Sequence, residues 1–356
     1  MASEADNEGA VETGGPSTDR SPTCPVSGET PRQWENVFGG QAVIEGVMMR
    51  GRHSWGLAVR RPSGDIARMA YPLTSLGDRH RWLKLPVVRG VIALFESMSL
   101  GVKALGVAAN ISLEETAGAE AGEPENVKSK AEAEAKAEAA AFGWKALAGT
   151  VVVAVAFAIG LFIVIPLVVV KAFEETFSNP FVFNLVEGVI RIVLFLLYIL
   201  GVSLIPDLRR VFQYHGAEHK VIHAYEACGR PDAKRALGYP PMHPRCGTGF
   251  LLVVMVIAIL VFAVVGKPGL LWLVISRIVG IPIIIGISYE VGIKWLGKHA
   301  KSLPARILLW PGLQLQRLTT REPTSDQLDV AAAALDEVIK MDERRQLELK
   351  EAAAPA

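Results

Sequence analysis

The sequence has few cysteines, no excess of charge of either sign and no apolar run near its start. Three cysteines among 356 residues are too few for a disulfide framework, which excludes the class of small disulfide-stabilised domains. The formal net charge is +1, so bulk charge gives no argument for a nucleic-acid partner. The class of protein must therefore be inferred from where apolar and polar residues fall along the chain.

Two low-complexity segments lack the apolar residues that a core needs. Residues 1–35 are acidic and rich in Gly, Pro, Ser and Thr, without the apolar segment of a signal peptide. They predict a disordered tail, because too little apolar surface offsets the entropy of ordering. Within residues 119–145, Ala, Glu and Lys alternate, which predicts a solvated, partly helical linker.

Apolar residues dominate the rest of the chain. They make up 51% of the sequence and give a mean hydropathy of +0.32, too high for an ordinary soluble domain. Runs near the length of about 20 residues that crosses a bilayer lie at 146–170, 181–205, 250–265 and 270–289. We predict an α-helical membrane protein with about four transmembrane helices, in residues 146–205 and 250–290, and a small cytoplasmic α+β portion.

Residues 36–85 predict a small cytoplasmic β-rich unit. Two short alternating runs, 55–60 and 66–71, flank a Pro-Ser-Gly-Asp turn, which is a hairpin signal. Several arginines make this unit basic. Basic segments next to a membrane typically follow the positive-inside bias, so we expect no nucleic-acid binding here.

Residues 86–118 predict an amphipathic helix. Arg89, Glu96 and Lys103 recur every seven residues and form one polar stripe along such a helix. The stripe favours a helix that lies in the membrane interface or packs under the spans. A transmembrane helix over residues 86–110 is the alternative.

Basic residues between the apolar runs predict the orientation. Residues 36–90 and 206–249 are rich in Arg and Lys, whereas residues 171–180 and 266–269 hold one lysine each. By the positive-inside rule, both termini and the 206–249 loop face the cytoplasm.

The C-terminal part, residues 291–356, then forms a cytoplasmic tail with an amphipathic helix. Thr324 and Gln327 have the spacing of a capping box, and apolar residues follow them at helical spacing.

The most informative stretch is the polar loop 206–249, which holds four of the seven histidines. His215 and His219 frame an H-x-x-E-H motif, the arrangement of inverted zinc proteases. On a helix, positions i and i+4 project both imidazoles from one face, with Glu218 beside them.

His243 and Cys246 add a second ligand-rich segment at the start of the third apolar run. Zinc takes nitrogen and sulfur ligands, four in a closed structural site and three plus water in a catalytic one. His215, His219, His243 and Cys246 are the candidate ligands for either kind of site. If three coordinate, Glu218 is the candidate base for a metal-bound water. A structural polar cluster without metal is the alternative.

Three further residues are accessory candidates at this site. His223 and Glu226 continue the polar stripe of the H-x-x-E-H helix. Glu290 follows the fourth apolar run at its cytoplasmic end, from which we expect it to reach the His-rich loop.

Three charges interrupt the apolar runs. Glu187 and Arg191 are an i, i+4 pair in the second run, and Arg277 lies in the fourth. Ionisable groups at that depth are costly and are expected to pair with one another. The pair is either structural or part of a transport path or substrate groove. One carboxylate facing two guanidiniums leaves a positive charge that suits an anionic lipid head group.

Five motifs carry a resemblance to a known family: Gly39–Gly51 (GGQAVIEGVMMRG), Tyr214–Lys220 (YHGAEHK), His243–Thr248 (HPRCGT), Gly286–Glu290 (GISYE) and Leu313–Pro323 (LQLQRLTTREP). With them the chain resembles the YqhQ-like family of bacterial multi-pass membrane proteins, a domain of unknown function. The resemblance implies a place in the bacterial cytoplasmic membrane. Members have been described as predicted metal-dependent enzymes, which rests on the same His and Cys residues and implies no particular reaction.

The leading hypothesis is a membrane-embedded, zinc-dependent hydrolase at the cytoplasmic face. Its substrate would be a lipid-linked or membrane-bound molecule that approaches along the inner leaflet, and an anionic lipid is a further candidate partner. The first alternative is a non-catalytic scaffold or assembly factor held together by the His/Cys cluster. The second is a transporter, for which four spans would require a homo-oligomer.

Overall fold

The protein was analysed as a computed structural model, which describes residues 38–120, 149–173, 175–177, 179–265, 270–299 and 302–353. The predicted tail, 1–35, and most of the predicted linker, 119–145, lie outside these ranges. The chain is mostly helical, with one small antiparallel sheet.

The sheet is a four-stranded meander in the order β1 (Gly39–Val43), β2 (Gly46–Arg50), β3 (Ser54–Arg60) and β4 (Ile66–Pro72). Each strand pairs antiparallel with the next one along the chain. The predicted hairpin is confirmed, because β3 and β4 pair in a register that sets Arg60 opposite Ile66.

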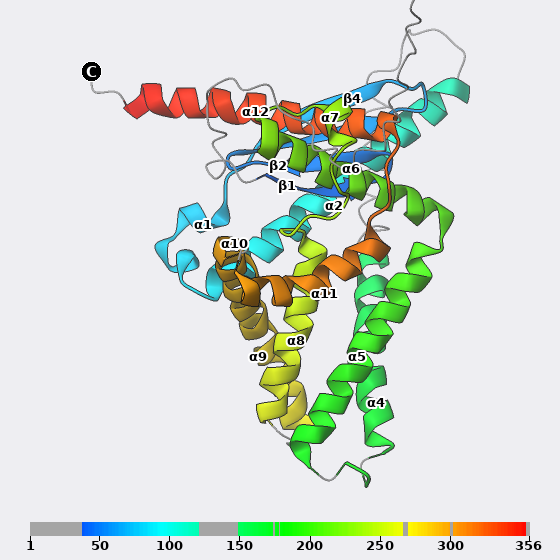
Figure 1. The fold of residues 1–356 in the computed structure, drawn as a ribbon, viewed down its shortest axis with the longest axis vertical. Helices are drawn as coiled ribbons and strands as arrows, with labels where there is room; N and C mark the ends of the chain where they lie inside the picture. Colours follow the sequence, from blue (N-terminus) through cyan, green and yellow to red (C-terminus); the bar gives the residue numbers. More distant parts are fainter. Residues whose placement is uncertain are drawn as a thin grey trace, which may run out of the picture.

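One face of the sheet is covered by α2 (Val88–Glu120), which follows α1 (Leu76–Arg79) and the short helix η1 (Arg81–Lys84). Small side chains of α2, Ala104 and Ala108, are fully buried in one cluster with Met48 and Leu57 of the sheet. Figure 1 shows α2 running crosswise between the sheet and the long helices. The predicted helix therefore forms and packs on the sheet.

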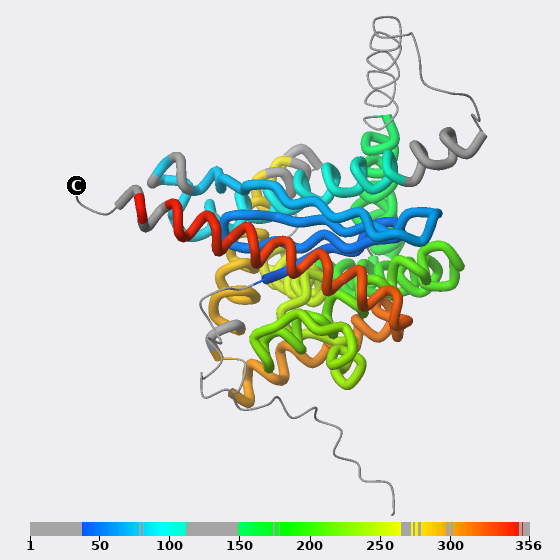
Figure 2. The backbone as a smooth tube through the Cα atoms, turned by 90° about the horizontal axis from the view of Figure 1, so that it is seen from above, coloured from blue at the N-terminus to red at the C-terminus, as the bar shows by residue number. Residues whose placement is uncertain are grey.

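The opposite face of the sheet is covered by α12 (Ser325–Ala353) and α6 (Pro206–Cys228). Figure 2 shows α12 running over the strands. Alternate residues of β2 point to opposite faces, so that Met49 packs toward these helices while Met48 packs toward α2. The predicted capping box is present, since the Thr324 backbone N–H donates to Oε1 of Gln327 at 3.0 Å.

The predicted apolar runs are all helical. Four helices among the described residues are long and apolar enough to cross a membrane, by length and composition: Val88–Ile111, Gly149–Lys171, Pro180–Ser203 and Gly247–Val264. The last three match predicted spans, and α9 (Leu270–Tyr289) occupies the fourth.

The long helices pack into one bundle below the sheet, as Figure 1 shows. The first contains the π-helix η2 (Gly160–Val164) and α4 (Ile165–Lys171), and it is followed by α5 (Pro180–Ser203). Next in the chain come the short α7 (Ala233–Ala236) and then α8 (Gly247–Val265), which packs on α9 through Phe262 and Ile284. Three elements, η3 (Glu290–Trp295), α10 (Leu296–His299) and α11 (Leu303–Thr319), lead from α9 to the C-terminal helix.

The charged pair of the second span is formed as predicted. Arg191 pairs with Glu187 one turn earlier in α5, and the Glu187 side chain is only 3% exposed. Arg191 Nε also donates to the backbone oxygen of Phe162, at 2.8 Å. Phe162 lies in η2, and a π-helix is a break in regular hydrogen bonding that can offer such a carbonyl. These contacts are those of a structural pair. The side chain of Arg277, in α9, lies outside the described residues.

Helix α6 is buried through its middle, between Tyr214 and Ala224, although its sequence is polar. Gly216 lies where the chain after α11 crosses it, and a Cβ at this glycine would come within 2.1 Å of the backbone oxygen of Arg321. The crossing is also held by the Arg321 N–H, which donates to the carbonyl of Phe212 at 2.9 Å. A glycine that disfavours the helix by its propensity is thus required by the close approach of a second backbone.

Gly216→Ala is expected to destabilise the protein by about 1–3 kcal/mol, because the added methyl group must displace backbone. Gly106→Ala is the matched control, since a Cβ there meets nothing within 4 Å and the change should stabilise α2 by up to about 1 kcal/mol. Thermal unfolding in detergent, followed by tryptophan fluorescence, measures both. Equal unfolding temperatures for the two variants would contradict this explanation of Gly216.

Candidate metal centre

The histidines of α6 lie on one face because the helix is regular through the motif. It begins at Pro206 and ends at Gly229, whose φ of 68° is the left-handed conformation of a helix C-cap. His215 and His219, one turn apart, have ring centroids 4.4 Å apart. In the sequence, Pro206 predicts the start of this helix and Cys228-Gly229 predicts its end, and the structure confirms both.

Two backbone carbonyls fix the orientation of these imidazoles. Nδ1 of His215 lies 2.8 Å from the oxygen of Thr319, and Nδ1 of His219 lies 2.7 Å from the oxygen of Pro241. A carbonyl only accepts hydrogen bonds, so each Nδ1 carries the proton and each Nε2 keeps its lone pair. Metal-binding histidines typically have this second-shell arrangement.

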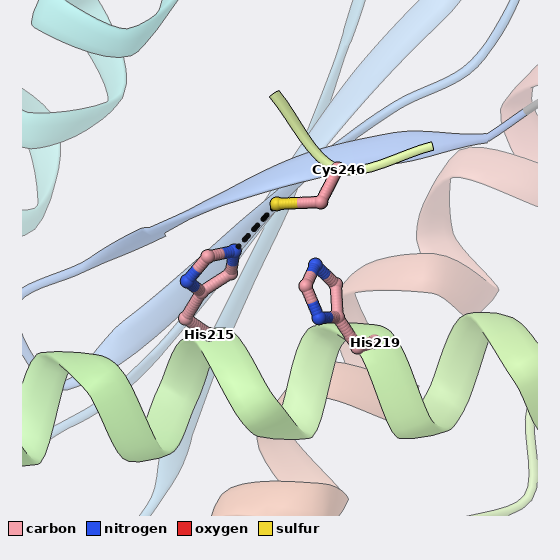
Figure 3. A group of neighbouring side chains, drawn as sticks. All are labelled: His215, His219 and Cys246. Carbon is pink, nitrogen blue, oxygen red and sulfur yellow. Dashed lines mark hydrogen bonds between the residues drawn. The ribbon is translucent and has the colours of Figure 1, made fainter. Parts of the chain in front are cut away.

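Cys246 completes a group of three donors, as Figure 3 shows. Its Sγ lies 3.3 Å from Nε2 of His215, and the ligand atoms of His215, His219 and Cys246 all lie within 4.8 Å of one another. The sulfur also accepts from the backbone N–H of Thr248, at 3.4 Å, in the first turn of α8. The first turn of a transmembrane candidate helix thus holds the thiol against α6.

His243 belongs to a second group, with His223 and Glu226, whose ligand atoms also lie within 4.8 Å of one another. The Arg245 backbone N–H donates to Nδ1 of His243 at 3.2 Å, so the neutral ring carries its proton on Nε2. That Nε2 lies 3.6 Å from a carboxylate oxygen of Glu226, which also pairs with Arg245. The second group is thus a polar wall of imidazoles and one ion pair.

The four predicted ligands therefore do not form a single group. His215, His219 and Cys246 come together, whereas His243 turns its Nε2 toward Glu226 because the Arg245 N–H occupies its Nδ1. The rings of His219 and His243 are still close, at 5.7 Å between centroids, so the two groups adjoin.

The structure also corrects the expectation for Glu290. Its carboxylate is bound by Arg89 from the start of α2, with Arg89 Nε donating to Oε1 at 2.6 Å and a second bond from Nη2. A carboxylate in a bidentate pair with Arg uses both of its oxygens in that pair and is not available to the histidines. Glu290 belongs to neither His group. His223 and Glu226, in contrast, lie beside the site as predicted.

Gln316 is a site residue that sequence reasoning missed. Its Oε1 accepts from the His243 N–H at 2.8 Å, and its Nε2 donates to the His243 carbonyl at 2.9 Å. The side chain is 1% exposed. Gln316 and Thr319 belong to the Leu313–Pro323 motif, so the motif was a signal that this segment matters. The amide's partner could not be inferred from the sequence.

Burial keeps three of the imidazoles at the site neutral. It lowers the pKa of His219 and lowers the pKa values of His223 and His243 to about 4. Neutral imidazole is the form that binds a metal ion, because the ligand nitrogen must be free of its proton. His219, in the three-donor group, is therefore in the form that binds a metal ion at neutral pH.

Glu218 is enclosed between α6 and β1. A Cβ on Gly40 would lie 2.9 Å from its Cδ, so the strand approaches the carboxylate closely. Burial raises the pKa of Glu218, while nearby His215 and His243 lower it to a smaller extent. Its Oε2 is buried without a hydrogen-bond partner, and an unsatisfied buried acceptor in a polar cluster is a sign of a functional site.

A cavity of about 290 Å³ adjoins both groups. Its polar end is lined by His223, Glu226, His243, Arg245 and Cys246. The remaining wall is mostly apolar and comes from α8, η3, α10 and α11. Cys246 belongs to the wall and to the three-donor group, so the cavity meets the candidate metal centre at its thiol.

The zinc content of single variants tests the division of the donors. His219→Ala and Cys246→Ala should each lower bound zinc at least about tenfold, as loss of a ligand requires. His243→Ala should leave it unchanged, because its Nε2 faces Glu226. His299→Ala is the matched control, since this exposed imidazole bonds the carbonyl of Trp295 one turn earlier and belongs to neither donor group. Elemental analysis of purified protein gives the molar ratio of zinc to protein. Loss of zinc from a folded His243→Ala variant would favour a site with four ligands.

The metal-free protein should lose stability on acidification. His243 has a pKa of about 4 in the fold, against 6.5 unfolded, so the unfolded chain binds the proton first as the pH falls. The free energy of unfolding is therefore highest above pH 6.5 and falls toward pH 4, with His243 contributing about 3 kcal/mol of the loss. His243→Gln should make this pH dependence shallower in denaturant titrations; an unchanged slope would exclude His243 as the cause.

Comparison with known proteins places these residues in a defined family. A family model described as "Protein of unknown function (DUF1385)" matches residues 85–341, which include both His groups. "Uncharacterized protein YqhQ" of Bacillus subtilis (strain 168) is 32% identical over 307 residues, covering 86% of this chain and 93% of that protein. No solved structure matches the chain. The chain therefore belongs to the YqhQ-like DUF1385 family, whose function is unknown.

Proposed function

We propose that the protein is a zinc-dependent hydrolase embedded in the bacterial cytoplasmic membrane. The observation that carries the proposal is the three-donor group of His215, His219 and Cys246, in which two imidazoles are held by carbonyls with Nε2 toward the sulfur. One of the three donors, Cys246, lines a cavity, which brings the group next to a space where a substrate could bind.

The donor set fits zinc. Two nitrogens and one sulfur are among its preferred ligands, and three protein ligands leave one position open for water or substrate. A zinc ion bound there would supply Lewis-acid polarisation and an activated water at neutral pH. His215, His219 and Cys246 would hold the ion, and Thr319 and Pro241 would hold the two imidazoles.

Glu218 is the proposed proton acceptor. Its Oε2 is buried and has no hydrogen-bond partner. The neighbouring His215 lowers the pKa of Glu218, by less than burial raises it. Because burial raises the pKa of Glu218, the carboxyl group is poised closer to neutral pH than an exposed glutamate. A carboxylate with a raised pKa both accepts a proton and returns it to a leaving group.

The charge pattern supports a cytoplasmic site. Four helices among the described residues have the length and composition of membrane spans, and the basic residues cluster in the segments that build the sheet and α6. By the positive-inside rule these segments, with both termini, face the cytoplasm.

Glu218→Gln tests the proposed base. Zinc-loaded protein is mixed with vesicles of total bacterial lipid, and mass spectrometry follows zinc-dependent products. The variant should bind as much zinc as wild type and form products at least about 100-fold more slowly, as expected for loss of general-base catalysis. Glu343→Gln, at an exposed position of α12, is the matched control and should behave as wild type.

The two ways of failing have different meanings. A Glu218→Gln variant that binds zinc and keeps full activity would show that Glu218 is not the base. If the zinc-bound wild type forms no product, the His/Cys group is the structural centre of a scaffold that ties α6 to α8.

A further inference from the structure

The cavity beside the candidate metal centre has two chemically different ends. The polar end carries His223, Glu226, His243 and Arg245. The other end is formed by apolar side chains of three elements: Phe250 and Val253 of α8, Ile293 of η3, and Leu308, Leu309 and Leu313 of α11. A ligand that fills both ends must itself be amphipathic.

The apolar end reaches the outer surface of the protein. Ile293 and Leu308 line the cavity and are also 39% and 47% exposed. Each has a tryptophan on its own element, Trp295 and Trp310, and both indoles are exposed. Exposed tryptophans are enriched where a membrane meets water. The cavity therefore opens at the level of the membrane interface.

Helix α11 has the orientation that such an opening requires. Figure 1 shows α11 lying across the upper ends of the long helices, not parallel to them. Its outward side chains, Leu303, Ile307, Leu308 and Trp310, are all large, apolar and exposed. A helix of this kind lies in the plane of the interface with its apolar face in the acyl region. A lipid chain beside α11 is thus next to the mouth of the cavity.

The polar end favours a negative charge on the ligand. Arg245 is the one Lys or Arg among the described residues that line the cavity. Its side chain is 26% exposed, so the guanidinium is partly shielded from water. Its partner Glu226 is 33% exposed and can turn to water, so an anionic group can take its place on Arg245.

We propose that the substrate is a membrane lipid with one hydrocarbon chain in the cavity and an anionic head at Arg245. The chain lies against Val253 and Leu308, and the head lies beside Cys246 and the imidazoles. Calling the lipid a substrate rests on the proposed hydrolase function. Binding of the lipid in the cavity does not depend on that function. At about 290 Å³ the cavity holds the head and the first part of a chain, and the remainder follows α11 into the bilayer.

A photoreactive palmitate tests the proposal. The probe carries a diazirine on its chain and a terminal alkyne, and it is added to the full-length protein in phosphatidylcholine nanodiscs. After irradiation, mass spectrometry should locate the crosslinks on the apolar wall. Leu308→Trp and Val253→Trp fill the cavity from two sides, and either should lower the crosslinking at least about fivefold. Ile307→Trp, on the same helix but outside the cavity, should stay within about twofold of wild type.

The head-group preference has its own comparison. Arg245→Gln should lower crosslinking of the carboxylate probe and leave that of the matching long-chain alcohol unchanged. If the carboxylate and the alcohol crosslink equally, in wild type and in the Arg245→Gln variant, the proposal that Arg245 binds an anionic head group is wrong. Crosslinks spread over the outer helix surfaces, with no effect of either tryptophan, would overturn the lipid cavity.

Zinc content separates this inference from the proposed function. The Leu308→Trp variant should keep its zinc and lose crosslinking to the probe. The double variant His215→Ala/His219→Ala should lose its zinc and keep crosslinking to the probe. If the lipid binds but zinc does not, the hydrolase proposal fails and the lipid site stands. If zinc binds but the lipid does not, the metal centre remains and its substrate is of another class.

Discussion

A buried polar helix needs partners for its donors and acceptors, and α6 is such a helix, with Oε2 of Glu218 as an exception. His215, His219, Lys220 and Tyr214 are polar and largely enclosed, and each is satisfied by a segment distant in sequence. An unsatisfied buried polar group costs about 1–3 kcal/mol. The path of residues 237–246 and 316–322 over α6 is thus set by these hydrogen bonds.

The three layers of α2, sheet and α12 give α6 a fixed support above the membrane helices. Strands β2 and β3 are buried on both faces, with Leu57 toward α2 and Ala58 toward α12 and α6. Close packing of this kind resists displacement, because few rearrangements keep its contacts. His215, His219 and Cys246 are therefore held between this closely packed layer and the first turn of α8.

Local features of the fold could be predicted from the sequence, and long-range pairings could not. Pro206 and Gly229 mark the ends of α6, and alternation marked the β3–β4 hairpin, because both signals depend only on neighbouring residues. Helical spacing also put His215, His219, His223 and Glu226 on one stripe. That His243 would face Glu226 depended on one backbone N–H, from Arg245.

Contacts between distant segments explain the other differences. Glu290 was expected near the histidines because both follow a membrane span, but the start of α2 brings Arg89 closer. Gly216 counted against a helix by propensity, and its reason became visible only with the carbonyl of Arg321 above it. Gln316 lies in the Leu313–Pro323 motif, but the sequence predicted no role for it. No pattern in one sequence tells which buried backbone group a side-chain amide will bond.

The distance along the chain between the site's parts has a consequence for how the protein is made. Cys246 leaves the ribosome soon after His215, but Gln316 and Thr319 emerge much later, and the bond from Thr319 to His215 joins residues 104 positions apart. Contacts of such separation form late, because the intervening chain must first be ordered. During synthesis, then, the imidazole of His215 is present before the Thr319 carbonyl that orients it, and His243 is present before the Gln316 amide that binds its backbone. A nascent or truncated chain therefore carries His215, His219 and Cys246 without the Thr319 contact, so the three-donor geometry proposed to bind zinc is complete only when synthesis is almost finished.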